Sequence, residues 1–410
     1  MKKSLIALIA ILNFVHSNSQ AQCYTDATTG EKINLTGGPC TNTVTSSVPF
    51  LRIAPDARSG AMGDAGIALT PDANALHFNA SNLAFSNEDL GVSATYTPWL
   101  SALGIQDIYL AYAAAFKKIN KRQTIGASIK YFSLGEISFT DDNGSPTGTG
   151  SPNELETSLT FIQQLSPKLS AAVTGKFIYS NLATGQSVGG NQVRAGKAGA
   201  ADISFTYKTP IRTAGGKNDL TIGLALTNIG SKISYTSSVY RDYLPANMGL
   251  GASYKIKVNN FNTVLFALDF NKLMVPTPVT RFLTDGKINP EYNKNGDKEN
   301  IPDYKEKSLV TSIVSSFADA PVKEELQEFT ISAGAEYWYD NQFAVRAGYF
   351  HEDLRKGGRR YATIGLGLKY NIFGLNFSYL IPTSAQRTPL DNTLRFSLLF
   401  DFGAFKADEE

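Results

Sequence analysis

The segment LRFSLLFDF, residues 394–402, alternates between large apolar side chains and small or polar ones. Leucine or phenylalanine stands at every second position, and Arg395, Ser397 and Asp401 lie between them. An alternation of period two is typical of a β-strand with two unlike faces. The preceding segment FGLNFSYLI, residues 373–381, follows the same rule. The end of the chain therefore predicts two consecutive amphipathic strands.

The same alternation extends back to Leu90 and predicts fourteen strands. Most of them are close to the roughly 9–11 residues that a tilted membrane strand needs. Their expected ranges are 90–98, 107–116, 123–134, 154–165, 168–180, 198–208, 219–230, 247–256, 261–271, 327–339, 342–351, 360–370, 373–381 and 393–402. Charged residues within the strands fall on the polar phase: Lys130, Glu156, Lys176, Asp202, Lys255, Asp269, Glu336, Arg346, Lys369 and Arg395. We therefore expect an all-β membrane protein, a 14-stranded antiparallel transmembrane β-barrel with a polar lumen.

The connections between these strands are alternately long and short for most of the chain. Ser166-Pro167 and Asp340-Asn341 are short, whereas the connection from Lys272 to Leu326 is far longer than a hairpin needs. Outer-membrane barrels have short periplasmic turns and longer outer loops. This pattern predicts an outer-membrane protein of a Gram-negative bacterium with both termini in the periplasm.

Composition excludes several classes of function. The chain has 410 residues, of which 18% are charged, against about 25% in a typical soluble protein. Its 38 Lys and Arg nearly balance its 36 Asp and Glu, so no basic field indicates a nucleic-acid partner. Three His and two Cys are too few for a zinc module or a disulfide-dense scaffold. We expect no metal and no cofactor.

The N-terminus has the features of an export signal. Lys2 and Lys3 precede an apolar run, and a polar stretch ending at Ala21 follows, so residues 1–21 are predicted to be a signal peptide. An N-terminal arm, residues 22–49, contains Cys23 and Cys40. In an oxidising compartment such a pair is expected to form a disulfide, although two free thiols remain an alternative.

Residues 50–89 do not alternate and are rich in Gly and Ala. Small residues at close spacing let one backbone pack on another. A fourteen-stranded barrel is too wide for its own side chains to fill, so this segment is expected to plug the lumen as a hatch ahead of the barrel, residues 90–405. The residues that mark the hatch are Gly60, Gly63, Asp64, Ala65, Gly66, Asn79 and Asn82.

The lead-in VPFLRIAPDARSGAMGDAG, residues 48–66, and the run DANALHFNASNL, residues 72–83, carry a family resemblance. The second run resembles the N-terminal hatch of FadL-like outer-membrane barrels. The lead-in resembles the PorV (LptO) type of the Bacteroidota type IX secretion system. The resemblance implies a non-enzymatic role with several partners. These are a large translocon barrel, cargo with C-terminal secretion domains, a sortase-like attachment complex, and membrane lipid or lipopolysaccharide.

Catalysis is not expected. After removal of the signal peptide only His77 and His351 remain. One falls in the hatch and the other at the outer end of a strand, so we do not expect them to share a site. The sequence predicts no catalytic residue.

Two hypotheses about function remain. One is a FadL-like transporter of a hydrophobic small molecule, and the other is a protein-interaction barrel that uses its outer loops. The long connection favours the second, because apolar residues exposed on a loop mark interaction sites. The expected partner-binding residues are Met274, Val275, Pro276, Pro278, Phe282 and Leu283, with Trp99 as a possible neighbour. The alternatives are that this loop folds over its own barrel and that Trp99 belongs to the aromatic girdle.

Overall fold

The computed structural model describes residues 23–26, 32–33, 40–100, 104–140, 145–188, 191–213, 216–236, 241–284, 287, 289–290, 292, 303–383 and 392–403. The predicted signal peptide, residues 1–21, lies outside these described residues. So do the last two residues, 404 and 405, of the predicted barrel.

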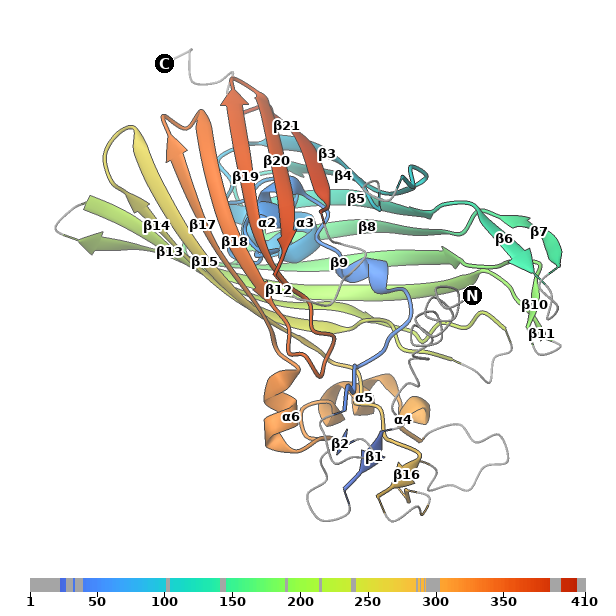
Figure 1. Ribbon diagram of the computed structural model, residues 1–410. Coiled ribbons are helices and arrows are strands. Elements are labelled where there is room, and N and C mark those ends of the chain that lie inside the picture. Colours follow the sequence, from blue (N-terminus) through green and yellow to red (C-terminus); the bar gives the residue numbers. More distant parts are fainter. Residues whose placement is uncertain are drawn as a thin grey trace, which may run out of the picture.

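Fourteen antiparallel strands close into one barrel, as predicted (Figure 1). Each strand pairs with its neighbours in the sequence of barrel strands, and the last strand pairs with the first. The strands are β3 (Leu90–Pro98), β4 (Ile108–Lys118), β5 (Gln123–Leu134), β8 (Asn153–Gln164), β9 (Leu169–Asn181), β12 (Gly196–Thr213), β13 (Gly216–Gly230), β14 (Asn247–Lys257), β15 (Asn262–Leu273), β17 (Thr330–Tyr339), β18 (Phe343–His351), β19 (Arg360–Tyr370), β20 (Phe373–Pro382) and β21 (Leu394–Asp401).

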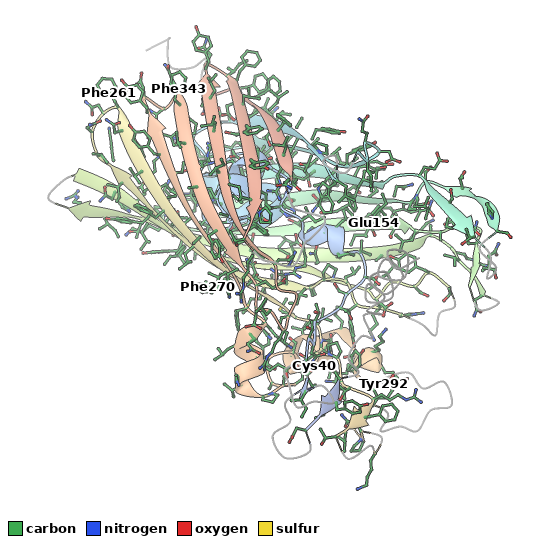
Figure 2. The ribbon with its side chains drawn as sticks, in the orientation of Figure 1. Cys40, Glu154, Phe261, Phe270, Tyr292 and Phe343 are labelled. Carbon is green, nitrogen blue, oxygen red and sulfur yellow. A yellow bond between two sulfur atoms is a disulfide. The ribbon has the colours of Figure 1, made fainter. Side chains whose placement is uncertain are left out.

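The two strand phases face different surroundings. Apolar side chains such as Leu159, Phe343 and Leu366 are more than half exposed. Side chains cover the outside of the barrel wall, Phe343 among them (Figure 2). The polar phase points inward, where Lys130, Glu336, Arg346 and Arg395 are almost fully buried. In the described part of the chain, no helix is both long and apolar enough to span a membrane.

The strands β12 and β13 are longer than the sequence predicts. They continue to Thr213 and from Gly216, whereas the alternation indicates ends at 208 and 219. Pro210 argues against a strand because it has no N–H to donate. Here Pro210 pairs with Asp219 of β13 and with no residue of β9, because the pairing of β12 with β9 ends at Tyr207. No backbone hydrogen bond between strands is therefore lost at Pro210. This turn is therefore short, like the other turns at the same end of the barrel.

The longer connections all lie at the other end, which we call the outer end. One of them carries the hairpin of β6 (Ile137–Thr140) and β7 (Pro146–Gly150), and another carries β10 (Ser187–Val188) and β11 (Asn191–Gln192). The β15–β17 connection contains β16 (Phe282–Leu283), α4 (Asp303–Glu306), α5 (Leu309–Ser315) and α6 (Val322–Gln327). Sequence alternation missed these helices, because they lie in a segment without a β pattern.

The N-terminal arm lies at the outer end with this connection. Its strand β1 (Tyr24–Thr25) pairs with β16 on one side and with β2 (Lys32–Ile33) on the other. We call this unit the outer cap: the described arm residues up to Ser47, together with the β15–β17 connection (Figure 1). The prediction that both termini are periplasmic is thus wrong for the arm, whereas Asp401–Gly403 do lie at the inner end. The strand pattern fixes the direction of each strand, but it does not show that the hatch leads from one end of the barrel to the other.

The segment from the arm to β3 lies inside the barrel. It forms η1 (Pro49–Arg52), α2 (Ala57–Ala61), α3 (Ala75–Phe78) and η2 (Ala80–Phe85). Pro49 stands in the first turn of η1, and Asp56 caps α2 by accepting a hydrogen bond from the Ser59 N–H at 2.8 Å. The short helices of this hatch lie within the ring of strands (Figure 1).

Backbone packs directly on backbone where the hatch contacts the wall. Gly63 has a φ of 69°, which favours glycine, and its N–H donates to Thr363 Oγ1 at 2.9 Å. A Cβ atom at Gly348 of β18 would lie 2.1 Å from the Gly63 nitrogen. Glycine on both surfaces therefore permits the close approach.

We predict that Gly348→Val displaces the hatch. The added side chain overlaps the backbone of Met62 and Gly63, and overpacking of this kind costs about 1–3 kcal/mol or more. Ion conductance of the purified barrel in planar bilayers should therefore rise. The matched control is Gly175→Val, because a Cβ at Gly175 of β9 has no atom within 4 Å. Wild-type conductance of Gly348→Val would contradict this account.

Candidate functional site

Buried ion pairs hold one side of the hatch to the wall. Arg58 of α2 donates through Nη2 to Glu336 Oε1 at 2.7 Å and through Nε to Glu336 Oε2 at 2.8 Å. Arg346 of β18 donates to the same carboxylate at 2.7 Å, and Arg58 also contacts Asp72 at 3.1 Å. Bidentate hydrogen bonds between charged groups stabilise the contact and also fix the orientation of the two side chains. The two carboxylates compensate two arginines away from bulk water.

The loop after α2 is held by a second set of contacts. Asp269 Oδ2 accepts hydrogen bonds from the N–H groups of Gly66 and Ile67, at 2.7 and 2.9 Å. Asp64 accepts from the Tyr361 hydroxyl at 2.6 Å and lies 3.4 Å from Arg395. The wall residues among them come from strands β15, β19 and β21, so three strands of the wall bind this loop.

The remaining predicted hatch residues also contact the wall or the hatch itself. Asn79 Nδ2 donates to Ile67 O and to Thr206 Oγ1, each at 2.9 Å, and Asn82 donates to Leu69 O. A Cβ at Gly60 would collide with Arg395. Ala65 is fully buried. The sequence identified these residues by type, and the structure gives each of them a contact.

A separate charge cluster lies on the opposite wall. Lys176 contacts Asp202 at 2.8 Å and Glu156 at 3.4 Å, and Lys130 lies 3.6 Å from Glu156. Lys130 also donates to the carbonyl of Leu51 at 3.1 Å, which ties η1 to β5. Burial lowers the pKa of His77 well below its usual value, and the nearby lysines lower it further. His77 and His351 do not share a site, as the sequence predicts.

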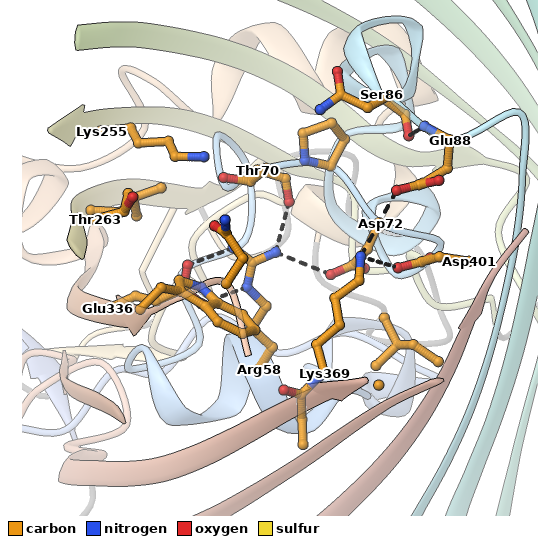
Figure 3. A pocket seen from close by; sticks show the side chains of 18 of the residues that line it. Arg58, Thr70, Asp72, Ser86, Glu88, Lys255, Thr263, Glu336, Lys369 and Asp401 are labelled. Carbon is orange, nitrogen blue, oxygen red and sulfur yellow. Dashed lines mark hydrogen bonds and ion pairs between the residues drawn. The ribbon is translucent and has the colours of Figure 1, made fainter. Parts of the chain in front are cut away.

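A cavity of about 650 Å³ opens between the hatch and the inner end of the barrel. Its walls include Asn341 and Asn371, which lie in inner turns, and its floor includes Arg58 and Asp72 (Figure 3). Lys369 lies 2.8 Å from Asp401 and 3.8 Å from Glu88 at its edge. The lining carries many charged groups, which suits water and ions better than an apolar ligand.

The outer cap is held together by a third ionic cluster. Lys272 contacts Glu325 at 2.9 Å and also Glu328. Lys356, from the β18–β19 loop, lies 2.9 Å from Glu328 and 2.7 Å from Glu324. The cluster therefore fastens α6 to the barrel rim.

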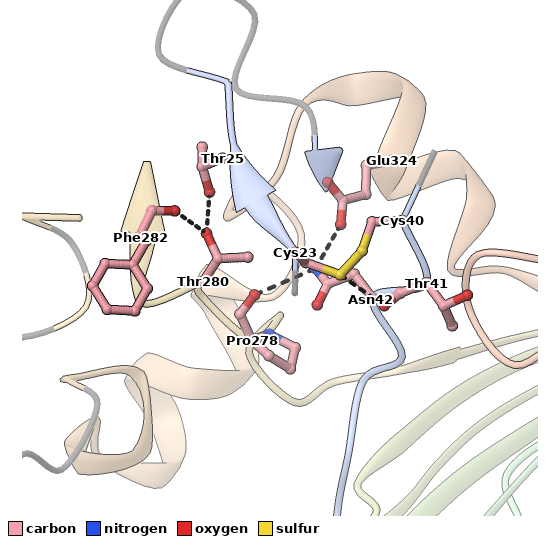
Figure 4. Close-up of a disulfide and its surroundings, with 9 residues drawn as sticks. All are labelled: Cys23, Thr25, Cys40, Thr41, Asn42, Pro278, Thr280, Phe282 and Glu324. Carbon is pink, nitrogen blue, oxygen red and sulfur yellow. Dashed lines mark hydrogen bonds between the residues drawn. A yellow bond between two sulfur atoms is a disulfide. The ribbon is translucent and has the colours of Figure 1, made fainter. Parts of the chain in front are cut away.

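The arm joins the same cluster. Asn42 donates to Glu324 Oε1 at 3.0 Å and to the carbonyl of Pro278 at 3.3 Å (Figure 4). Cys23 and Cys40 form a disulfide beside it. The bridge closes the arm on itself, and the β1–β16 pairing and these polar contacts hold the arm against the β15–β17 connection.

The predicted partner-binding residues are not exposed apolar side chains. Met274, Val275 and Pro276 are buried in the cap, and Pro278, Phe282 and Leu283 are half-buried. Trp99 is 9% exposed and packs on Phe132 at a ring distance of 5.0 Å. The expectation of exposure is therefore wrong. The loop folds over its own barrel, because the arm and α6 supply it with a core.

The exposed apolar residues of the cap lie elsewhere. Val310 and Val314 on α5 are 71% and 68% exposed, and Val322 and Leu326 on α6 are 77% and 67% exposed. Each pair is spaced by four residues and so lies on one face of its helix. This spacing is visible in the sequence, but two residues four positions apart are too weak a signal to predict so short a helix.

A family model described as type IX secretion system protein PorV matches residues 39–280, which is more than half of the chain. The chain belongs to this PorV family. Its match begins in the arm and covers the hatch and nine of the fourteen barrel strands, β3 to β15. The barrel fold and the family match together show that the chain is an outer-membrane component of the type IX secretion system.

Solved structures with a similar fold are distant from this PorV-family chain in sequence. The Pseudomonas putida toluene transporter TodX is 12% identical, with a TM-score of 0.46, over 85% of this chain and 98% of that chain. A Pseudomonas aeruginosa FadL homologue is 10% identical, with a TM-score of 0.40, over 88% and 100%. No curated protein matches the sequence. These likenesses concern the fold alone.

We predict that Glu336→Gln destabilises the barrel of this PorV-family protein by about 3–5 kcal/mol, because it leaves Arg58 and Arg346 without their shared counter-ion. Urea titration of the purified barrel, followed by heat-modifiability on gels, measures the loss. Asp219→Asn is the control, since the Lys208–Asp219 pair is 4.0 Å long and about a third exposed, and should change stability by less than about 1 kcal/mol. Equal effects of the two changes would refute the anchoring role.

We predict that Cys23→Ser loosens the arm without unfolding the barrel. The bridge closes a loop over 17 positions, and such a bridge contributes about 3 kcal/mol. Limited proteolysis should cut the arm of the variant much faster than that of the wild type, while the barrel keeps its heat-modifiability. Thiol labelling of the non-reduced wild type should find no free cysteine. Two labelled thiols would show that the bridge does not form.

Proposed function

We propose that this chain is a non-enzymatic carrier in type IX secretion. It binds the large outer-membrane translocon through its outer loops, receives cargo with C-terminal secretion domains, and passes this cargo to the sortase-like attachment complex. The observation that carries the proposal is the exposed apolar faces of α5 and α6 on the outer cap. Exposed apolar patches on an otherwise polar surface are typical of protein–protein interaction sites.

The outer cap is suited to this role because it is rigidly built. The cap is held in one arrangement by the ion pairs of Lys272 and Lys356, by the disulfide and by the β1–β16 pairing. A partner would therefore meet a preformed surface. A preformed surface lowers the entropy cost of binding. Lys323, which is exposed beside Val322 on α6, supplies a polar neighbour to these faces.

The alternative, transport of a hydrophobic small molecule, has less support. A transported apolar ligand needs an apolar path through the lumen. In the described residues the hatch is fixed to the wall by buried ion pairs, and the cavity at its inner side is lined by groups such as Lys255, Glu336 and Lys369. These features favour a closed barrel that acts through its outer surface.

The combined change Val310→Ser, Val314→Ser and Leu326→Ser tests the proposal. Apolar anchors often contribute more than about 2 kcal/mol, so recovery of the translocon should fall by about thirtyfold or more. Affinity purification from outer membranes with mass spectrometry measures recovery, and cargo secretion is assayed in parallel. The barrel should stay folded, because all three side chains are exposed.

The matched control is Lys323→Ser, an exposed residue on α6 beside Val322. It should leave translocon recovery and cargo secretion unchanged. If the triple variant also retains both, α5 and α6 are not the docking surface. If the wild type co-purifies with a lipid but never with a translocon, the transport alternative gains support instead.

A further inference from the structure

The inner end of the barrel has an uneven distribution of charge around its rim. Four consecutive inner turns, which join β4 to β5, β8 to β9, β12 to β13 and β14 to β15, lie side by side along one part of this rim. Ten Lys or Arg residues but only one acidic residue, Asp219, fall within these turns and the adjoining strand ends, residues 117–122, 165–168, 208–219 and 255–261. This side of the inner rim is therefore strongly basic.

Six of these basic side chains are exposed and have no counter-ion. We call them the basic arc: Lys117, Lys121, Arg122, Lys168, Arg212 and Lys257. The side chain of each makes no ion pair or hydrogen bond with any residue that the structure describes. A row of fixed charges of one sign attracts ligands of the opposite sign.

Backbone hydrogen bonds between neighbouring turns bring these cations together. The Gln164 N–H donates to the Arg122 carbonyl at 2.8 Å, so the β8–β9 turn lies beside the β4–β5 turn. The Lys208 N–H donates to the Lys168 carbonyl at 2.8 Å, which places the same turn beside β12. Lys168 thus lies between the basic residues of two neighbouring turns. An anion bound among them would offset the repulsion between like charges.

The other side of the inner rim has the opposite character. It contains four acidic residues and one basic residue, over residues 86–89, 340–342, 369–372 and 401–403. The basic residue, Lys369, already contacts Asp401 at 2.8 Å and Glu88 at 3.8 Å. Exposed aromatic side chains follow this side, as in the interfacial girdle of a membrane barrel: Tyr339, Phe343, Tyr370 and Phe373. An anion should therefore bind at the basic arc and not here.

The position of the basic arc favours a membrane lipid as the source of that anion. Three of its turns, residues 119–122, 165–168 and 258–261, are short, so their side chains stay close to the ends of the membrane strands. Each of these turns also has an aliphatic side chain that is more than half exposed: Ile119, Leu165 and Val258. Basic residues at a membrane surface reach the headgroups, and apolar neighbours can stay in the acyl region. An acidic protein would match the cations but not the aliphatic residues.

We propose that the basic arc binds the phosphate headgroups of anionic phospholipids in the inner leaflet of the outer membrane. Its guanidinium and ammonium groups donate charged hydrogen bonds to phosphate oxygens, and Ile119, Leu165 and Val258 contact the acyl chains beside the headgroups. This inference goes beyond the proposed function, because it concerns the inner end, whereas α5 and α6 lie at the outer end. Failure of either proposal leaves the other standing.

Native mass spectrometry of the purified, mature barrel in detergent measures this binding. Phosphatidylglycerol, which is anionic, and phosphatidylethanolamine, which has no net charge, are titrated separately with the same acyl chains. Each Lys or Arg near an anionic membrane surface strengthens binding by about fivefold, so the wild type should bind phosphatidylglycerol at least about fivefold more tightly. Replacing all six residues of the basic arc with Gln should abolish this preference.

A matched pair of double variants tests whether the effect is local. Lys121→Gln with Arg122→Gln removes two charges from the basic arc and should weaken the binding of phosphatidylglycerol by about fivefold or more. Arg194→Gln with Lys197→Gln removes two charges from exposed residues at the outer end and should leave this binding unchanged. All variants should keep their heat-modifiability on gels, because the replaced side chains are exposed.

Several results would overturn the proposal. These are equal binding of the two lipids by the wild type, a preference that survives in the six-residue variant, and equal losses in the two double variants. Release of the bound lipid by excess inorganic phosphate would indicate a site for phosphate ion instead of a lipid. Tighter binding of a hexaglutamate peptide than of phosphatidylglycerol would overturn the choice of a lipid in favour of an acidic protein.

Discussion

The structure depends on one constraint: a lumen as wide as that of fourteen strands must be filled, and every charge placed inside it must be compensated. The hatch meets the first condition with small residues, so that Gly63 lies against Gly348 with no side chain between them. It meets the second with Arg58, which shares the carboxylate of Glu336 with Arg346. Removing one partner would strand a charge away from water, so the ion pairs fix where the hatch sits.

The path of the chain connects the two ends of the molecule. The arm begins in the outer cap, η1 enters the lumen at Arg52, and the hatch leaves at the inner end to begin β3. The cap is therefore joined to the hatch through a few residues. Lys130, which binds the carbonyl of Leu51, holds the point where they meet. The cap and the plug are consequently connected through this short segment of the chain.

The sequence predicts the barrel well because one physical rule, lipid outside and polar groups inside, acts on every strand. Residues such as Lys176 and Leu159 reveal their side of the wall by phase alone. The hatch is likewise visible, since its Gly and Ala residues break the alternation. The outer end is less predictable. Whether Val275 is exposed depends on the arm and α6 covering it, and those contacts join residues more than two hundred positions apart.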